Sequence, residues 1–171
     1  MDIILTPDQA IFLTHFELGS HSYEFGVTKR VLTAIPESQS GYKPDASSRS
    51  ALELAHHIAI SEEWFLQSIL SGSFAWSGEP GLPAGTTFAS VAEHYAKAIP
   101  ELVEQVKALP AEKLVQQVNF FGMLNNSAAT YLDVMNNHTI HHRGQLAAYI
   151  RPAGGKVPNI YGGSFDEPMQ G

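Results

Sequence analysis

Three histidines fall close together in the stretch from Asn136 to Leu146, which reads NNHTIHHRGQL. Because an α-helix turns by about 100° per residue, His138 and His142 would lie only about 40° apart on one helical face. This i, i+4 spacing lets two imidazoles bind one metal ion. The apolar stripe of the helix passes through His142 and has His138 at its edge, whereas His141 lies roughly 120° from the stripe centre. The spacing therefore predicts that His138 and His142 face inward and that His141 flanks them.

Helical periodicity extends over four segments of the chain. We expect helices over residues 7–34, 51–70, 88–109 and 127–151. Thr6 followed by Pro7 is typical of a helix start, and Ser50 with Glu53 three residues later has the pattern of a capping box. Pro100 is expected to kink the third helix or break it in two.

Each segment places apolar residues three or four positions apart, as a helix packed on one face requires. In the first helix these are Phe12, Phe16, Tyr23, Val27 and Val31, and in the second they are Ala51, Leu54, Ile58, Phe65 and Ile69. Four amphipathic helices with long connecting loops predict an all-α four-helix bundle. We expect one domain over residues 1–171, with an ordered coil from Gly154 onward that folds back over the bundle.

Composition narrows the classes of function. The net charge is −7 and the ten basic residues are scattered, which argues against a nucleic-acid partner. Cysteine is absent, so any thiol chemistry must use a thiol carried by the substrate. No apolar run approaches the ~18 residues of a membrane span, and the N-terminus lacks the basic start of a secretion signal. A soluble cytoplasmic protein is the expectation.

His57 on the second helix is the candidate third ligand. It falls within about 80° of the stripe centre of that helix, whereas the neighbouring His56 points nearly opposite. Three neutral imidazoles leave a coordination position open, as in catalytic sites, where a bound water or thiol loses its proton readily. Nitrogen ligands suit zinc or nickel, with cobalt, copper or iron as further options, and disfavour magnesium and calcium. The alternative is ordinary core histidines, because one HxxxH pair is a weak signal.

Three polar side chains lie where they could orient an imidazole or touch a ligand. Glu53 precedes His57 by one turn, and Asp133 precedes His138 by a little over one turn. Gln145 is close in angle to His138. For the two carboxylates, a solvated position on the helix surface is the favoured alternative. No residue is assigned a catalytic role.

Four further residues carry expectations about their surroundings. Arg143 is expected to meet solvent or a partner subunit, and His15 to lie at the edge of the core or at the surface. Phe74 and Trp76 belong to a long glycine- and proline-rich loop of the kind that often borders functional sites. They either line a pocket or cover the end of the bundle.

Three motifs occur in a fixed order along the chain. They are Glu53-Leu54-Ala55-His56-His57-Ile58, then His138-Thr139-Ile140-His141-His142-Arg143-Gly144-Gln145-Leu146, then Gly154-Gly155-Lys156-Val157-Pro158-Asn159-Ile160-Tyr161. In this combination the chain resembles the DinB/YfiT-like family of damage-inducible four-helix-bundle proteins. The similarity covers nearly the whole chain.

The resemblance implies an up-up-down-down bundle, a divalent metal ion held by three histidines and a homodimer. Carried over by position, the ligands are His57, His138 and His142. Characterised relatives include transferases and isomerases that use a low-molecular-weight thiol. The leading hypothesis is a metal-dependent enzyme that activates such a thiol, or water, against a small electrophile. The alternatives are a non-enzymatic metal-binding stress-response protein and a plain helical interaction module.

Overall fold

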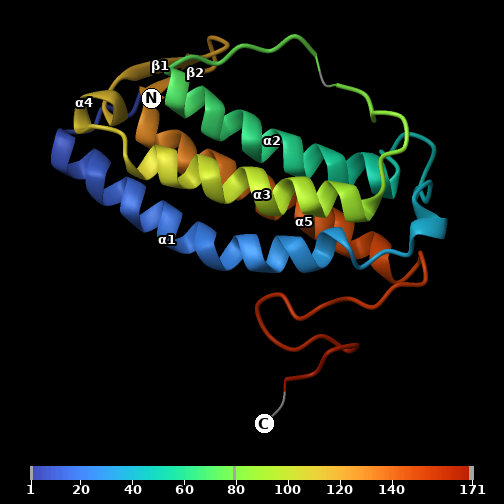
Figure 1. Cartoon of the computed structure of the whole chain (residues 1–171). Helices are drawn as coiled ribbons and strands as arrows, with labels where there is room; N and C mark the ends of the chain where they lie inside the picture. Colours follow the sequence, from blue (N-terminus) through green and yellow to red (C-terminus); the bar gives the residue numbers. More distant parts are fainter. Residues whose placement is uncertain (1, 79, 170–171) are drawn as a thin grey trace.

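Four long helices make up most of the chain in this computed structural model, which describes residues 2–78 and 80–169 (Figure 1). Their bounds are α1 (Pro7–Leu32), α2 (Ala51–Ser71), α3 (Phe88–Lys107) and α5 (Tyr131–Ile150). Helix α1 packs on α3 and α5, and α2 packs on the same two helices. The four helices therefore enclose one core, with α1 diagonally opposite α2. The prediction of an all-α fold is confirmed.

Contacts along the helices establish their relative directions. Glu17 and Glu24 of α1 bond to Asn136 and Arg143 of α5, respectively, so these two helices run in parallel. Figure 1 shows α2 and α3 running the opposite way. The order of directions is therefore up-down-down-up, and the expected up-up-down-down order is wrong.

The two connections that flank α2 account for its direction. The segment 33–50 stays at one end of the bundle, where it forms η1 (Glu37–Gln39) and the N–H of Ala51 donates to the carbonyl of Tyr42. The segments 72–78 and 80–87 instead lie along the bundle, between the end of α2 and the start of α3 (Figure 1). Both connections are long in sequence, so length alone does not reveal which of them crosses the bundle.

Smaller elements join α3 to α5. They are α4 (Ala111–Leu114), the antiparallel hairpin of β1 (Gln117–Phe120) and β2 (Leu124–Ser127), and η2 (Ala128–Thr130). The last long helix therefore begins at Tyr131, later than expected. The side chain of Ser127 accepts a hydrogen bond from the N–H of Leu5, and it thereby ties the N-terminal segment to β2.

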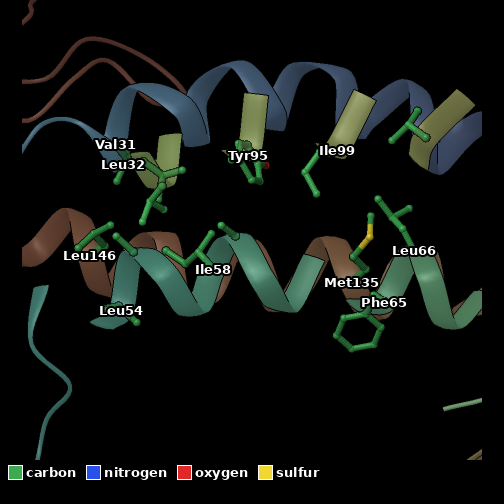
Figure 2. Close-up of a cluster of buried hydrophobic side chains, with 14 of the residues drawn as sticks. Val31, Leu32, Leu54, Ile58, Phe65, Leu66, Tyr95, Ile99, Met135 and Leu146 are labelled. Atoms are coloured by element: carbon green, nitrogen blue, oxygen red, sulfur yellow. The ribbon is translucent and has the colours of Figure 1, made fainter. Parts of the chain in front are cut away.

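The core confirms the expected inner face of α2 and the burial of Val27 and Val31 on α1, but it corrects the expected positions of the aromatic residues of α1. Side chains of α1 and α3 point toward those of α2 and α5 in Figure 2. Phe12, Phe16 and Tyr23 are 70%, 59% and 55% exposed, although we expected them to face inward. The buried face of α1 instead carries several polar residues: Thr14, Glu17, His21 and Thr28. For Glu17, His21 and Thr28, the other helices supply hydrogen-bond partners, which stabilise polar side chains in the interior.

Two further features bear on the expectations. Helix α3 continues through Pro100, which is exposed. Proline has no N–H group, so the carbonyl four residues earlier lacks its helical donor, and it lies on a side of the helix that is open to water. The tail after α5 is an ordered coil, as expected, and the ring of Tyr161 stacks on Tyr23 of α1 at 6.2 Å. Among the described residues, no helix is both long and apolar enough to cross a membrane.

Candidate metal centre

The structure brings three histidines together between α2 and α5. His57, His138 and His142 each place a ring nitrogen so that these atoms all lie within 4.8 Å of one another. The ring centroids are 5.2 Å apart for His57 and His138, 4.5 Å for His57 and His142, and 4.4 Å for His138 and His142. This group could hold a metal ion. Among the described residues, it consists of these three histidines.

The chemical state of these imidazoles suits a cation. Burial is the main reason why the pKa of His138 falls from 6.5 to about 4, and the positive charge that His142 and His57 would carry lowers it further. His138 is therefore neutral near pH 7, as a metal ligand must be. Its Nδ1 atom is buried, and no other described residue forms a hydrogen bond with it.

Gln145 holds the ring of His142. Its Oε1 lies 2.8 Å from Nδ1 of His142, one helical turn away. An amide oxygen only accepts, so Nδ1 carries the proton and the lone pair of His142 is on Nε2. The amide nitrogen of Gln145 lies 3.1 Å from Nε2 of the exposed His141. His141 thus flanks the group, and Gln145 orients an imidazole in the way that outer partners orient metal ligands.

The two carboxylates that were expected to orient the histidines form hydrogen bonds with other residues. Glu53 accepts from the backbone N–H of Ser50 in the capping box of α2 and lies 3.7 Å from Lys43. Asp133 is exposed and accepts from the side chain of Asn137. His56 faces α3, where it lines a cavity together with His94.

Arg143 corrects another expectation. Its side chain is 1% exposed, rather than directed to solvent or to a partner subunit. The guanidinium bonds to the carboxylate of Glu24 at 2.5 Å and donates to the hydroxyl of Tyr161 at 2.6 Å. Arg143 therefore joins α1, α5 and the C-terminal coil from inside the protein.

The sequence analysis did not identify Glu62, a buried carboxylate beside the centre. Glu62 is fully buried and accepts hydrogen bonds from Tyr95 and Thr139, the residue after His138. The signal was present, because Glu62 follows Ile58 by four positions and precedes Phe65 by three, on the apolar stripe of α2.

Aromatic side chains border the group on one side. The ring of Phe65 lies 5.7 Å from that of His138, and Phe74 packs on Phe65 at 5.8 Å. Phe74 is buried and covers the end of the bundle. Trp76 is 48% exposed, and its ring packs on that of Trp64 at 5.3 Å. We call Phe65, Phe74, Trp64 and Trp76 the aromatic wall, which thus reaches the surface at Trp76.

Comparison with known proteins agrees with this fold. The model of the DinB family matches residues 20–170, and the chain belongs to that family. Two proteins of Bacillus subtilis (strain 168), described as uncharacterized, are similar in sequence. YrdA is 27% identical over 158 residues, which is 91% of each chain. YjoA is 27% identical over 128 residues, which is 75% of this chain and 82% of YjoA.

Solved structures of DinB-like proteins share the architecture. A crystal structure from Bacillus cereus ATCC 10987 has a TM-score of 0.71 at 25% identity and covers 85% of this chain and 95% of its own. The crystal structure of YjoA has a TM-score of 0.64 at 25% identity, with 85% and 93% covered. The recognition of the family from the three motifs is confirmed.

Proposed function

We propose that this protein is a metal-dependent enzyme that activates a low-molecular-weight thiol, or water, against a small electrophile. His57, His138 and His142 would hold a divalent transition metal, with zinc or nickel favoured. The convergence of three imidazoles from two helices is the observation that supports this most directly. Three nitrogen ligands leave a position for a substrate atom.

The residues present fit such an ion. Burial and the neighbouring positive charges favour the neutral form of His138, and Gln145 directs the lone pair of His142 to Nε2. When bound, a divalent ion of this kind lowers the pKa of a coordinated thiol or water, which makes a nucleophile available near neutral pH. The aromatic wall would exclude water from one side.

The test is conjugation of a thiol to a model electrophile by the zinc- or nickel-loaded protein. We expect a rate above that of the His142→Ala variant, together with about one metal ion per chain by elemental analysis. A His141→Ala variant is the matched control, because His141 lies outside the group of three. Equal rates for the loaded protein and His142→Ala would reject the enzymatic function.

The second candidate is a non-enzymatic metal-binding stress-response protein in which the ion stabilises the bundle. The location of the ligands on two packed helices favours it, since an ion there would hold α2 against α5. This function predicts a large fall in melting temperature on chelation and no thiol binding at the ion. If adding a thiol changes the absorption spectrum of the bound ion, the thiol binds at the ion, and this result would count against the second candidate.

A homodimer is the proposed assembly, and a cytoplasmic location stays a prediction. The outer face of α1 exposes Phe12 and Phe16, whose rings stack at 6.2 Å. A second copy of the chain would cover these rings, and burial of such apolar area stabilises association. Light scattering should give twice the mass of one chain, and the Phe12→Glu variant should give a monomer. A monomeric parent protein would reject the proposal.

A further inference from the structure

A pocket lies between α1 and α3, on the side of the bundle opposite the three histidines. Helices α1 and α3 pack on each other, as do α2 and α5, so these two pairs form opposite sides of the four-helix core. The pocket has a volume of about 210 Å³. Since a cavity of about 150 Å³ holds a benzene ring, one aromatic ring fits in this pocket.

The walls of the pocket are mostly apolar. Leu18 and Phe25 line it from α1, and Pro100 and Val103 line it from α3. The ring of Phe25 stacks on that of Tyr95 at 5.1 Å, and this contact holds the Phe25 ring in place. Walls of this kind favour an apolar ligand, and the flat face of a fixed ring favours an aromatic one.

The mouth of the pocket carries two charges that compensate each other. Glu104 and Lys107 line the pocket with exposed side chains, and their charged groups form an ion pair at 2.6 Å. The pair brings no net charge to the mouth, so it does not attract ions of either sign. A neutral ligand is therefore favoured over a charged one.

His21 is the polar residue that reaches the pocket from the core. It is 4% exposed, and its Nε2 lies 2.6 Å from the buried carboxylate of Glu62. Tyr95 and Thr139 both donate to that carboxylate, and burial raises the pKa of Tyr95, so its hydroxyl keeps the proton that it donates. A carboxylate with these partners also accepts from Nε2–H, which leaves the lone pair of the neutral imidazole on Nδ1.

Nδ1 of His21 is the atom that a ligand can reach. No described residue forms a hydrogen bond with it, and it is not among the fully enclosed polar atoms that lack a partner. It therefore contacts the space of the pocket that the His21 side chain lines. A ligand hydroxyl that donates to Nδ1 would complete the hydrogen bonds of this imidazole, whose other nitrogen is held by Glu62.

We propose that this pocket is a binding site for a small neutral phenol, whose ring lies against Phe25 and whose hydroxyl donates to Nδ1 of His21. The phenol of a tyrosine side chain has a pKa of about 10, so such a ligand is neutral near pH 7. This inference goes beyond the proposed function and does not depend on it, because none of the three histidines of the candidate metal centre lines the pocket.

The test is a titration of the purified protein with 4-fluorophenol, followed by fluorine NMR. We expect saturable binding with a Kd below about 1 mM. 4-Fluorotoluene, which has a methyl group in place of the hydroxyl, should bind about tenfold more weakly, because it cannot donate to Nδ1. Equal affinities for these two molecules would overturn the role of His21. No binding of 4-fluorophenol would overturn the site.

A variant at the mouth of the pocket tests where the phenol binds. Ser22 is exposed and lines the pocket, so Ser22→Trp should block the mouth and abolish binding without a change in the core. Ser20→Trp is the matched control, because Ser20 is exposed on the same helix but does not line the pocket. It should bind 4-fluorophenol as the parent protein does. Unchanged binding in Ser22→Trp would overturn the location.

Two further variants separate the anchor from the candidate metal centre. His21→Gln keeps an N–H group for Glu62 but removes the ring nitrogen, so the affinity for 4-fluorophenol should fall to that for 4-fluorotoluene. An intact tenfold preference in His21→Gln would overturn the anchor, and the Ser22→Trp variant keeps the test valid if His21→Gln does not fold. His142→Ala should bind 4-fluorophenol normally. Loss of binding in His142→Ala would place the phenol at the metal ion and overturn the proposal.

Discussion

Nε2 of His21 lies 2.6 Å from Oε1 of Glu62, and both side chains are buried. Tyr95 donates to both oxygens of the same carboxylate at 3.0 Å, and Thr139 donates to Oε2 at 2.8 Å. These four residues come from α1, α2, α3 and α5, so one carboxylate connects all four long helices. A polar centre of this kind is stable only when each of its groups has a partner.

We predict that Glu62→Leu lowers the free energy of unfolding by about 3–5 kcal/mol, because it leaves His21 buried without its carboxylate. The double variant His21→Leu/Glu62→Leu should lose less than the sum of the two single variants, since both polar partners are then removed together. Urea unfolding followed by circular dichroism measures both effects. Additive losses would show that the two side chains are not coupled.

The chain contains a matched control in the pair His94–Glu63. This pair has the same 2.6 Å separation, but the side chain of His94 is 54% exposed. Glu63→Leu should therefore cost under about 1 kcal/mol. Equal losses for Glu62→Leu and Glu63→Leu would contradict the importance of burial for the first pair.

Gln145 should affect metal affinity without being a ligand. In Gln145→Leu, the proton on Nδ1 of His142 loses its acceptor, so the ring is no longer held with its lone pair on Nε2. Loss of such an outer partner lowers metal affinity by about 10–100-fold. Gln145→Glu keeps an acceptor and should retain or raise the affinity.

Competition with a chelating dye measures these affinities. Gln67→Leu is the control, because Gln67 is exposed on α2 and bonds to Glu63. It should bind the ion as the parent protein does. If Gln145→Leu does so as well, the hydrogen bond has no part in orienting His142.

The metal-free protein should lose stability as the pH falls. The pKa of His138 is about 4 in the folded chain, mainly because of burial, and 6.5 is its ordinary value. Between these values the unfolded chain binds a proton that the folded chain does not, so acid favours unfolding. The contribution of His138 is fully present above pH 6.5 and is lost as the pH falls toward about 4.

Melting temperature in the presence of a chelator, measured across this pH range, tests the prediction. His138→Gln should flatten the fall between pH 6.5 and about 4, whereas His15→Gln, at an exposed position of α1, should leave it unchanged. A parent protein whose metal-free form melts at one temperature throughout this range would contradict the lowered pKa of His138.

The sequence located the three histidines because their positions depend on local geometry. The turn of a helix places His138 and His142 on one face, and the stripe of α2 places His57 inward. Neither inference needs knowledge of the other helices. The spacing of apolar residues by three or four positions in α2 and α3 also depends only on the geometry of each helix. The inner faces that it predicts for these two helices agree with the structure.

The polar interior was not accessible in the same way. Arg143 and His21 are buried because Glu24 and Glu62, far away in sequence, complete their hydrogen bonds. Polar residues have no preference for the core until a partner is known, so periodicity assigned the inner face of α1 to its aromatic residues. The directions of α2 and α5, which the resemblance implied and local periodicity does not determine, were wrong, since the paths of the connecting loops depend on contacts that form only in the folded chain.

The C-terminal coil provides the last prediction. The hydroxyl of Tyr161 accepts from Arg143 at 2.6 Å and donates to the carboxylate of Glu24, while its ring stacks on Tyr23. Tyr161→Phe keeps the ring but leaves one donor of the buried Arg143 without its acceptor, at a cost of about 1–3 kcal/mol.

Amide hydrogen exchange of residues 157–167 measures this effect locally. These residues are held to one another by hydrogen bonds between the backbone and the side chains of Asp166 and Ser164. Tyr161→Phe should accelerate exchange in the coil more than in α2, since it releases the coil from α1 and α5 before the bundle opens. Phe165→Ala, on the same coil but 91% exposed, should change exchange little. Equal acceleration by both variants would mean that the coil is held by its own turn, and not by the contact of Tyr161 with Arg143.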